Sequence, residues 1–160
     1  MVVRGFVEAS EENSVQINPH LCFDGRCEAA FRFYQQVLGG TLTVMLSYGE
    51  SELAQQVAPE WRSKIIHAAL SFEGGQLAGV DMLPGTYKPP QGFFVIIGIP
   101  TRDRAEAVFH ALSEGGTIQM PFQQTFWTTG FGVLVDRFGI PWEVNSEVGA
   151  HAPSSASARA

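Results

Sequence analysis

Four residues have side chains that could hold a metal ion or move a proton: His20, His67, Asp81 and Glu143. Each lies in a stretch where apolar and polar residues alternate. Because side chains of a strand point to opposite faces in turn, we expect each of the four to point away from the helix-covered face of its strand. Two imidazoles and a carboxylate suit a divalent cation such as Zn²⁺, Ni²⁺, Mn²⁺ or Fe²⁺.

Glu143 lies in the middle of FGIPWEVNS, residues 138–146, which reads as a turn followed by a strand. A carboxylate there faces either water or a cavity that needs a charge, because a buried, unpaired carboxylate is costly. We predict that Glu143 is a metal ligand that can also act as a catalytic base. The alternative for Glu143 is a solvated or Arg-paired residue, and the alternative for His20 is a strand-end residue bonded to the backbone. Asp81 precedes the turn segment MLPGTYKPP, where Asp is common for conformational reasons.

A second group of candidates is aromatic. Trp127, Phe131, Tyr48 and Phe94, together with Phe126, could line a site for a flat organic ligand. The alternative is ordinary packing in the hydrophobic core. The sequence therefore leaves open a metal-dependent site and a metal-free binding site.

The positions of these side chains depend on strands, and a duplicated sequence pattern predicts those strands. CEAAFRFYQQVLGG, from Cys27, and residues 103–114 have the apolar spacing of amphipathic helices, and a Gly-Gly pair follows each. The stretch F-x5-GGTLTV, from Phe33, matches F-x5-GGTIQM, from Phe109, at an offset of 76 residues. Extended stretches precede and follow both helices. We predict an α+β fold of two βαβββ modules whose mixed sheets curl into a cup.

The predicted modules have definite limits along the chain. Residues 1–15 form a flexible N-terminal segment, residues 16–90 the first module and residues 91–146 the second. Residues 147–160, which are small and polar, form a disordered tail.

Composition excludes some function classes. The chain has 160 residues and a net charge of −6, and its basic residues are scattered, so we expect no nucleic-acid partner. No apolar run approaches the roughly 20 residues that span a membrane, and the N-terminus lacks a signal-peptide core. We therefore expect a cytoplasmic protein without a membrane partner. Cys22 and Cys27 have neither zinc-site nor disulfide-scaffold spacing and should be reduced thiols.

Three stretches give the chain a family resemblance. INPHLCFDGRCEAAFRFYQQVLGG, IIHAALSFEGGQLAGVDMLPG and FQQTFWTTGFGVLVDRFGIPWEVN together resemble the PhnB-like branch of the vicinal oxygen chelate superfamily. That superfamily includes glyoxalase I, extradiol dioxygenases, fosfomycin-resistance enzymes and bleomycin-binding proteins. The resemblance covers about residues 16 to 146 and implies paired βαβββ modules, a homodimer and a U-shaped cup.

The resemblance also implies where metal ligands would lie, on the first and last strands of each module. His20 matches the first-strand position of the first module, and Glu143 matches the last-strand position of the second. Asp81 lies near the last-strand position of the first module. The strand GFFVIIGIP of the second module has no His where catalytic members have one. His67, on a neighbouring strand, could replace it.

Two functions follow. The first is a metal-dependent isomerase, lyase or dioxygenase acting on a small oxygen-bearing substrate, with the divalent metal on His20, His67 and Glu143. The second is a non-catalytic protein that binds a small molecule or antibiotic, as bleomycin-resistance proteins do.

Overall fold

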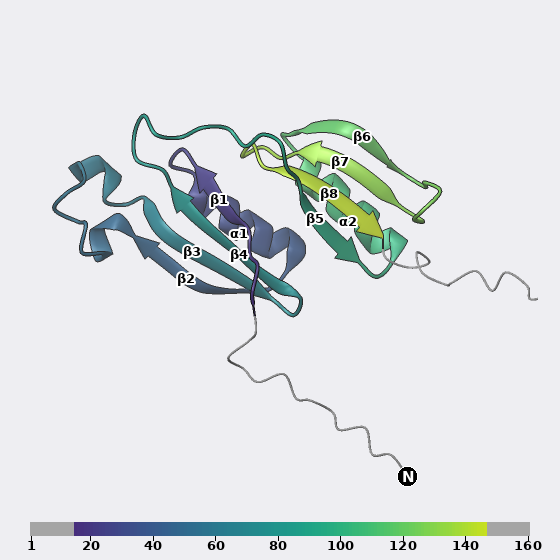
Figure 1. Ribbon diagram of the computed structural model, residues 1–160, viewed down its shortest axis with the longest axis horizontal. Helices are drawn as coiled ribbons and strands as arrows, with labels where there is room; N and C mark the ends of the chain where they lie inside the picture. Colours follow the sequence, from purple (N-terminus) through teal and green to yellow (C-terminus); the bar gives the residue numbers. More distant parts are fainter. Residues whose placement is uncertain (1–14, 147–160) are drawn as a thin grey trace, which may run out of the picture.

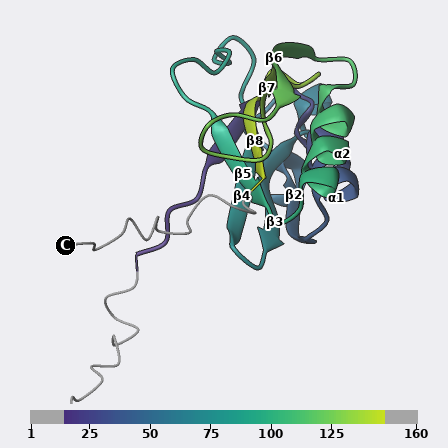
Figure 2. The ribbon, with the colours of Figure 1, turned by 90° about the vertical axis from the view of Figure 1, so that its right-hand side faces the viewer.

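The computed structural model describes residues 15–146 and contains two sheets covered by two helices on one side (Figures 1 and 2). The first module consists of β1 (His20–Phe23), α1 (Cys27–Leu38), β2 (Thr41–Ser47), β3 (Ile65–Phe72) and β4 (Gly75–Asp81). The second consists of β5 (Val95–Ile99), α2 (Arg102–Ser113), β6 (Thr117–Gln123), β7 (Phe131–Val135) and β8 (Pro141–Ser146). Each module is βαβββ, which confirms the predicted α+β fold.

The two sheets have the same topology. Their strand orders are β1-β4-β3-β2 and β5-β8-β7-β6. The first and last strands of each module pair in parallel, and the other neighbours are antiparallel. The sheets are mixed, as predicted, and they do not close on one another. Pro121 lies in β6, an edge strand, where a residue without an N–H is tolerated.

The repeated Gly-Gly pairs mark equivalent close approaches of the backbone. A Cβ on Gly40 would lie 2.7 Å from the carbonyl oxygen of Ser71, and one on Gly116 would lie 2.3 Å from that of Val135. In both modules, therefore, the chain leaves the helix and passes directly over the backbone of the next strand but one. Only glycine fits that passage, which explains why the sequence repeats it.

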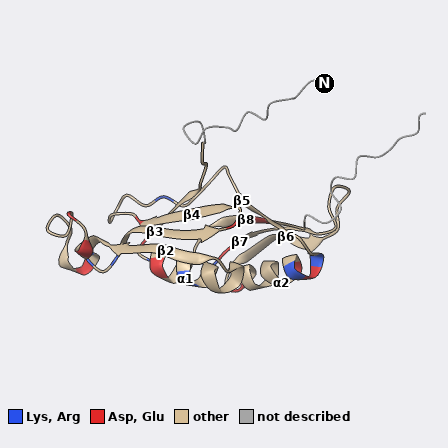
Figure 3. Cartoon of the chain, turned by 90° about the horizontal axis from the view of Figure 1, so that it is seen from below, with Lys and Arg blue, Asp and Glu red and all other residues tan. Residues whose placement is uncertain are grey.

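Both helices lie on the same side of the sheets, and one hydrophobic core runs beneath them through both modules (Figure 3). The opposite side of each sheet, which we call the open face, has no helix over it. Charged residues lie mainly on the helices and connecting loops. No helix in the described residues is long and apolar enough to cross a membrane.

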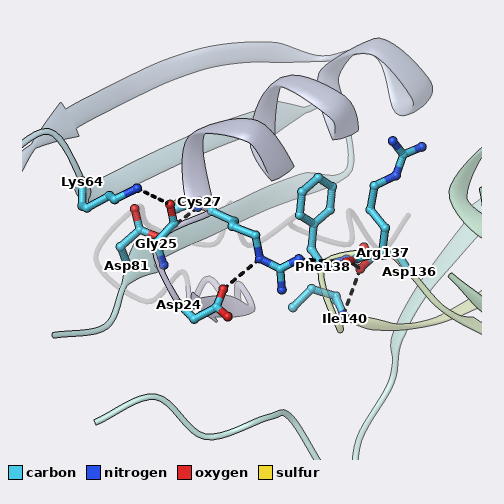
Figure 4. A network of polar contacts seen from close by, with 10 residues as sticks. Asp24, Gly25, Cys27, Lys64, Asp81, Asp136, Arg137, Phe138 and Ile140 are labelled. Carbon is cyan, nitrogen blue, oxygen red and sulfur yellow. Dashed lines mark hydrogen bonds and ion pairs between the residues drawn. The ribbon is translucent and has the colours of Figure 1, made fainter. Parts of the chain in front are cut away.

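A buried carboxylate joins the two modules. Asp136, in the β7–β8 turn, is 3% exposed and accepts hydrogen bonds from the Tyr34 hydroxyl of α1, at 2.5 Å, and from the Trp142 indole N–H, at 2.8 Å. It also accepts from the backbone N–H groups of Phe138 and Ile140 (Figure 4). Burial, followed by the charge of Asp136, raises the pKa of Tyr34 well above its ordinary value.

The predicted boundary between the modules lies within the described residues, whereas the two predicted tails lie almost wholly outside them. The division between residues 90 and 91 falls in the connection between β4 and β5. The predicted flexible segment and disordered tail lie outside the described residues, apart from residue 15.

Candidate functional site

Two of the predicted metal ligands lie together on the open face of the first sheet. His20 begins β1, and His67 lies on β3, with β4 between those strands. Their ring centroids are 6.4 Å apart, and the rings are perpendicular. Both side chains are exposed, so a cation in solution could reach them.

Glu143 lies on a different sheet from the two histidines. It is on β8, where Ile96 of β5 and Val133 of β7 are its neighbours in register. Within residues 15–146, no three His, Cys, Asp or Glu side chains come close enough together to hold a metal ion. One chain thus supplies a pair of imidazoles but does not fit the predicted three-ligand metal site. Metal binding by these residues stays a prediction that a second copy of the chain would have to complete.

The predicted face of Asp81 is wrong. Asp81 is 1% exposed and points toward the helix, where its carboxylate accepts hydrogen bonds from the N–H groups of Gly25 and Cys27, each at 2.9 Å. Its second oxygen accepts from the N–H of Ile65, at 2.8 Å. Asp81 therefore fixes the start of α1 against the sheet.

The surroundings of Cys27 disfavour ionisation of its thiol. Both cysteines in the described residues are free, and Cys27 is buried at the start of α1. Burial, followed by the charge of Asp81, raises the pKa of the Cys27 thiol. The thiolate is the nucleophilic form, so Cys27 is not a candidate nucleophile at neutral pH.

The aromatic candidates of the second module lie on the two sides of Glu143 along the strands, Phe94 toward one end and Phe131 toward the other. Trp127 and Phe131 have ring centroids 5.5 Å apart, and Phe126 packs on Trp127 at 4.6 Å. Phe94 precedes β5 by one residue and alternates with the buried Val95, which places it on the open face. We call Phe94, Ile96, Trp127, Phe131, Glu143 and Asn145 the aromatic patch.

The patch leaves large apolar area in contact with water. Trp127 and Phe94 are each 45% exposed, and Ile96 is 60% exposed. Aromatic and aliphatic surface of this kind, next to one carboxylate, is typical of a binding surface.

Asn145 is a member of the patch that the sequence reasoning did not single out. It lies two residues after Glu143 on the same face of β8 and is in register with Phe131. Its side-chain oxygen is shielded from solvent and accepts no hydrogen bond within residues 15–146. The alternation in IPWEVNS already contained this signal, because it places Asn145 beside Glu143.

A short hydrogen-bonded loop positions Trp127. The Thr128 hydroxyl, which is buried, donates to the backbone carbonyl of Ser146 at 2.5 Å, and the Ser146 N–H donates to the carbonyl of Gly130 at 2.8 Å. A Cβ on Gly130 would lie 2.4 Å from the Phe122 ring. The loop is thus fastened to the end of β8, which holds the Trp127 ring beside Phe131.

Tyr48 lies away from the other aromatic candidates. It is in the short 3-10 helix η2 (Tyr48–Glu50) that follows β2 in the first module, and it is buried. Its hydroxyl donates to the backbone carbonyl of Asp81 at 2.8 Å. The structure therefore gathers Trp127, Phe131 and Phe94 in one module and places Tyr48 in the other. A ligand-binding role for each remains a prediction.

Comparisons with known proteins agree with the fold. The family model described as the Glyoxalase/Bleomycin resistance protein/Dioxygenase superfamily matches residues 16–144. Protein YjdN of Escherichia coli (strain K12) is 31% identical over 137 residues, covering 81% of this chain and 93% of YjdN.

Two solved structures are similar in shape. Protein PA1353 from Pseudomonas aeruginosa is 41% identical, with a TM-score of 0.77 over 84% of this chain and 98% of that one. A PhnB protein from Bacillus cereus is 24% identical, with a TM-score of 0.67 over 82% of this chain and 99% of that one, which is a likeness of fold.

Proposed function

Because the chain belongs to the glyoxalase/bleomycin resistance protein/dioxygenase superfamily, we propose that it binds a small, flat organic molecule on the open face of its second sheet. The observation that carries this proposal is the aromatic patch. Its exposed rings lie beside a carboxylate and an unsatisfied amide oxygen.

The patch favours a flat ligand because of its apolar members. A planar ring system lying against Trp127 would remove exposed apolar surface of the patch from water. Each square ångström of apolar surface buried is worth about 25 cal/mol, so a few hundred would give a free energy of several kcal/mol. Aromatic pairs add about 0.5–1.5 kcal/mol beyond the buried area.

The polar members of the patch favour a ligand that donates hydrogen bonds. The Glu143 carboxylate, when ionised, and the Asn145 Oδ1 atom are both acceptors. A shielded acceptor without a partner costs about 1–3 kcal/mol, which a ligand N–H group could recover. The Asn145 side chain as a whole is only half-buried, so a side-chain rotation could bring Oδ1 to the surface. A flat aromatic amine, cationic at neutral pH, meets both requirements.

Calorimetric titration with proflavine, a flat cationic diamine, tests the proposal. We expect saturable binding of proflavine, and weaker binding of acridine, which lacks the amino groups, and of the anion 2-naphthoate. Trp127→Leu should weaken proflavine binding at least tenfold, which is about 1.4 kcal/mol. Glu143→Gln should remove most of the preference for proflavine over acridine.

Trp61→Phe is the matched control. Trp61 is half-buried in the 3-10 helix η3 (Pro59–Trp61) of the first module, so its replacement should leave proflavine binding unchanged. No saturable binding, or equal losses in Trp127→Leu and Trp61→Phe, would contradict the proposal.

The histidine pair supports a second candidate function, metal-dependent catalysis. His20 and His67 lie close enough to face one cation between them. Glu143 from a second copy of the chain would have to supply the remaining protein ligand, so this candidate requires the homodimer that the resemblance implies.

Titration of chelator-treated protein with Ni²⁺ or Zn²⁺ tests this candidate, with sedimentation measured alongside. His67→Gln should abolish tight binding. His110→Gln should not, because His110 is an exposed residue of α2 whose ionic neighbour is Glu106, at 4.0 Å. A protein that stays monomeric with each metal, or equal metal binding by both variants, would remove the metal enzyme from consideration.

A further inference from the structure

A groove separates the two modules. It shares Ile96 with the aromatic patch but differs from the patch in the rest of its lining and in its charge. It has a volume of about 450 Å³ and runs between the β3–β4 hairpin and β5. Its apolar lining includes Ile17, Leu38, Phe72, Leu77, Ile97 and Val108. This volume lies within the range of roughly 300–1,000 Å³ that small-molecule sites occupy.

Among the residues that the structure describes, a single ionisable one lines the groove, Arg104 of α2. Within residues 15–146, no hydrogen bond, ion pair or ring contact engages its guanidinium. The positions one turn away on the same helix side, Pro100, Ala107 and Val108, carry no carboxylate. Arg104 also borders a second hollow, between α1 and α2, so its side chain lies where the two spaces meet.

The chemistry of the groove defines its occupant. An apolar channel can accept an aliphatic chain, and a guanidinium at its border can form a two-pronged hydrogen-bonded pair with a carboxylate. The chain has a net charge of −6, so an arginine without an acidic partner beside apolar surface favours an anionic ligand group there. We propose that the inter-module groove binds an aliphatic monocarboxylate, with its chain between β5 and the β3–β4 hairpin and its carboxylate on Arg104.

Calorimetric titration of the full chain with decanoate, below its micelle concentration, tests the inference. We expect saturable binding of decanoate, weaker binding of decylamine and an affinity that rises up to about fourfold for each methylene added from hexanoate to decanoate. Arg104→Gln should weaken decanoate binding about tenfold while leaving 1-decanol binding unchanged. Arg32→Gln is the control, because Arg32 is an exposed arginine of α1 already paired with Glu28.

A second variant tests the groove itself. Gly74 lines it in the β3–β4 turn, and a Cβ there would meet no atom within 4 Å, so the fold can accept a larger residue. Gly74→Trp should abolish binding of both decanoate and decanol. The same variant should retain proflavine binding, which separates this inference from the proposed function.

Three results would overturn the inference. The first is an absence of saturable decanoate binding, and the second is an equal effect of the Arg104 and Arg32 variants. The third is a wild-type protein that sediments as a dimer and a Gly74→Trp variant that sediments as a monomer, because a second copy of the chain would then cover the groove.

Discussion

The three tyrosines of the chain provide a graded test of the buried network that joins the modules. Tyr34 is fully buried and donates to the carboxylate of Asp136 at 2.5 Å. Tyr48 donates to a neutral backbone carbonyl, that of Asp81, at 2.8 Å. Tyr87 is half-buried, and no described residue is its hydrogen-bond partner. Replacement by Phe keeps each ring and removes only the hydroxyl.

The expected losses follow from the acceptor. A hydrogen bond to a charged group contributes about 1.5–3 kcal/mol and a neutral one about 1 kcal/mol. Asp136 keeps three other donors in Tyr34→Phe, so its charge is not left without partners. We therefore expect losses of about 1.5–3 kcal/mol for Tyr34→Phe, about 1 kcal/mol for Tyr48→Phe and under about 0.5 kcal/mol for Tyr87→Phe.

Urea denaturation followed by Trp fluorescence measures these losses as differences in the free energy of unfolding. The dependence on urea concentration should be the same in all four proteins, because the buried surface does not change. A Tyr34→Phe loss no larger than that of Tyr87→Phe would refute the assignment of Asp136 as the polar link between the modules.

Two further predictions concern pH and backbone packing. In the unfolded chain the Cys27 thiol loses its proton above its ordinary pKa of 9.0. In the folded protein the pKa of this thiol is raised, so it stays protonated there. Above pH 9 the unfolded chain therefore binds fewer protons than the folded one. The free energy of unfolding should therefore fall by up to about 1.4 kcal/mol per pH unit above pH 9, and Cys27→Ala should remove that slope in urea titrations between pH 9 and 10. Burial of Tyr34 adds a second fall above pH 10. Gly116→Ala should cost about 1–3 kcal/mol, because its Cβ would collide with the Val135 carbonyl, whereas Gly74→Ala, in open space, should be nearly neutral; equal effects in thermal unfolding would contradict this.

Much of the fold was predictable from two local signals. Helical periodicity that ends in Gly-Gly gave both helices, and the repeat from Phe33 and Phe109 gave the duplication. The repeat is readable because the same steric demand, a backbone crossing at Gly40 and Gly116, recurs in each module.

Asp81 shows why it was harder to predict which side of a strand packs against the helix. In β4, the side that packs on α1 consists of Leu77, Gly79 and Asp81, which looks polar, and the open side includes the apolar Val80. Gly79 has no side chain because the Phe31 ring occupies that space: a Cβ would lie 2.3 Å from it. Period-2 alternation separates two faces, but it does not say which face the helix covers when close packing requires glycine.

The part of the candidate site that depends on alternation within one strand was predictable, and the part that depends on the arrangement of the sheets was not. Alternation in β8 places Glu143 opposite the buried Trp142 and Val144, as the structure has it. The separation of Glu143 from the two histidines depends on how two sheets are arranged, and the position of Tyr48 depends on a long connection between β2 and β3. Neither is a property of local sequence.

The most direct test of ligand binding at the aromatic patch is an NMR titration of the three tryptophan indole N–H signals with proflavine. The Trp142 indole is buried and bonded to Asp136, and Trp61 is in the first module, so both signals should stay in place. The Trp127 signal should shift progressively and saturate. A shift of the Trp61 signal instead, or no shift of the Trp127 signal at saturating proflavine, would contradict the proposed function.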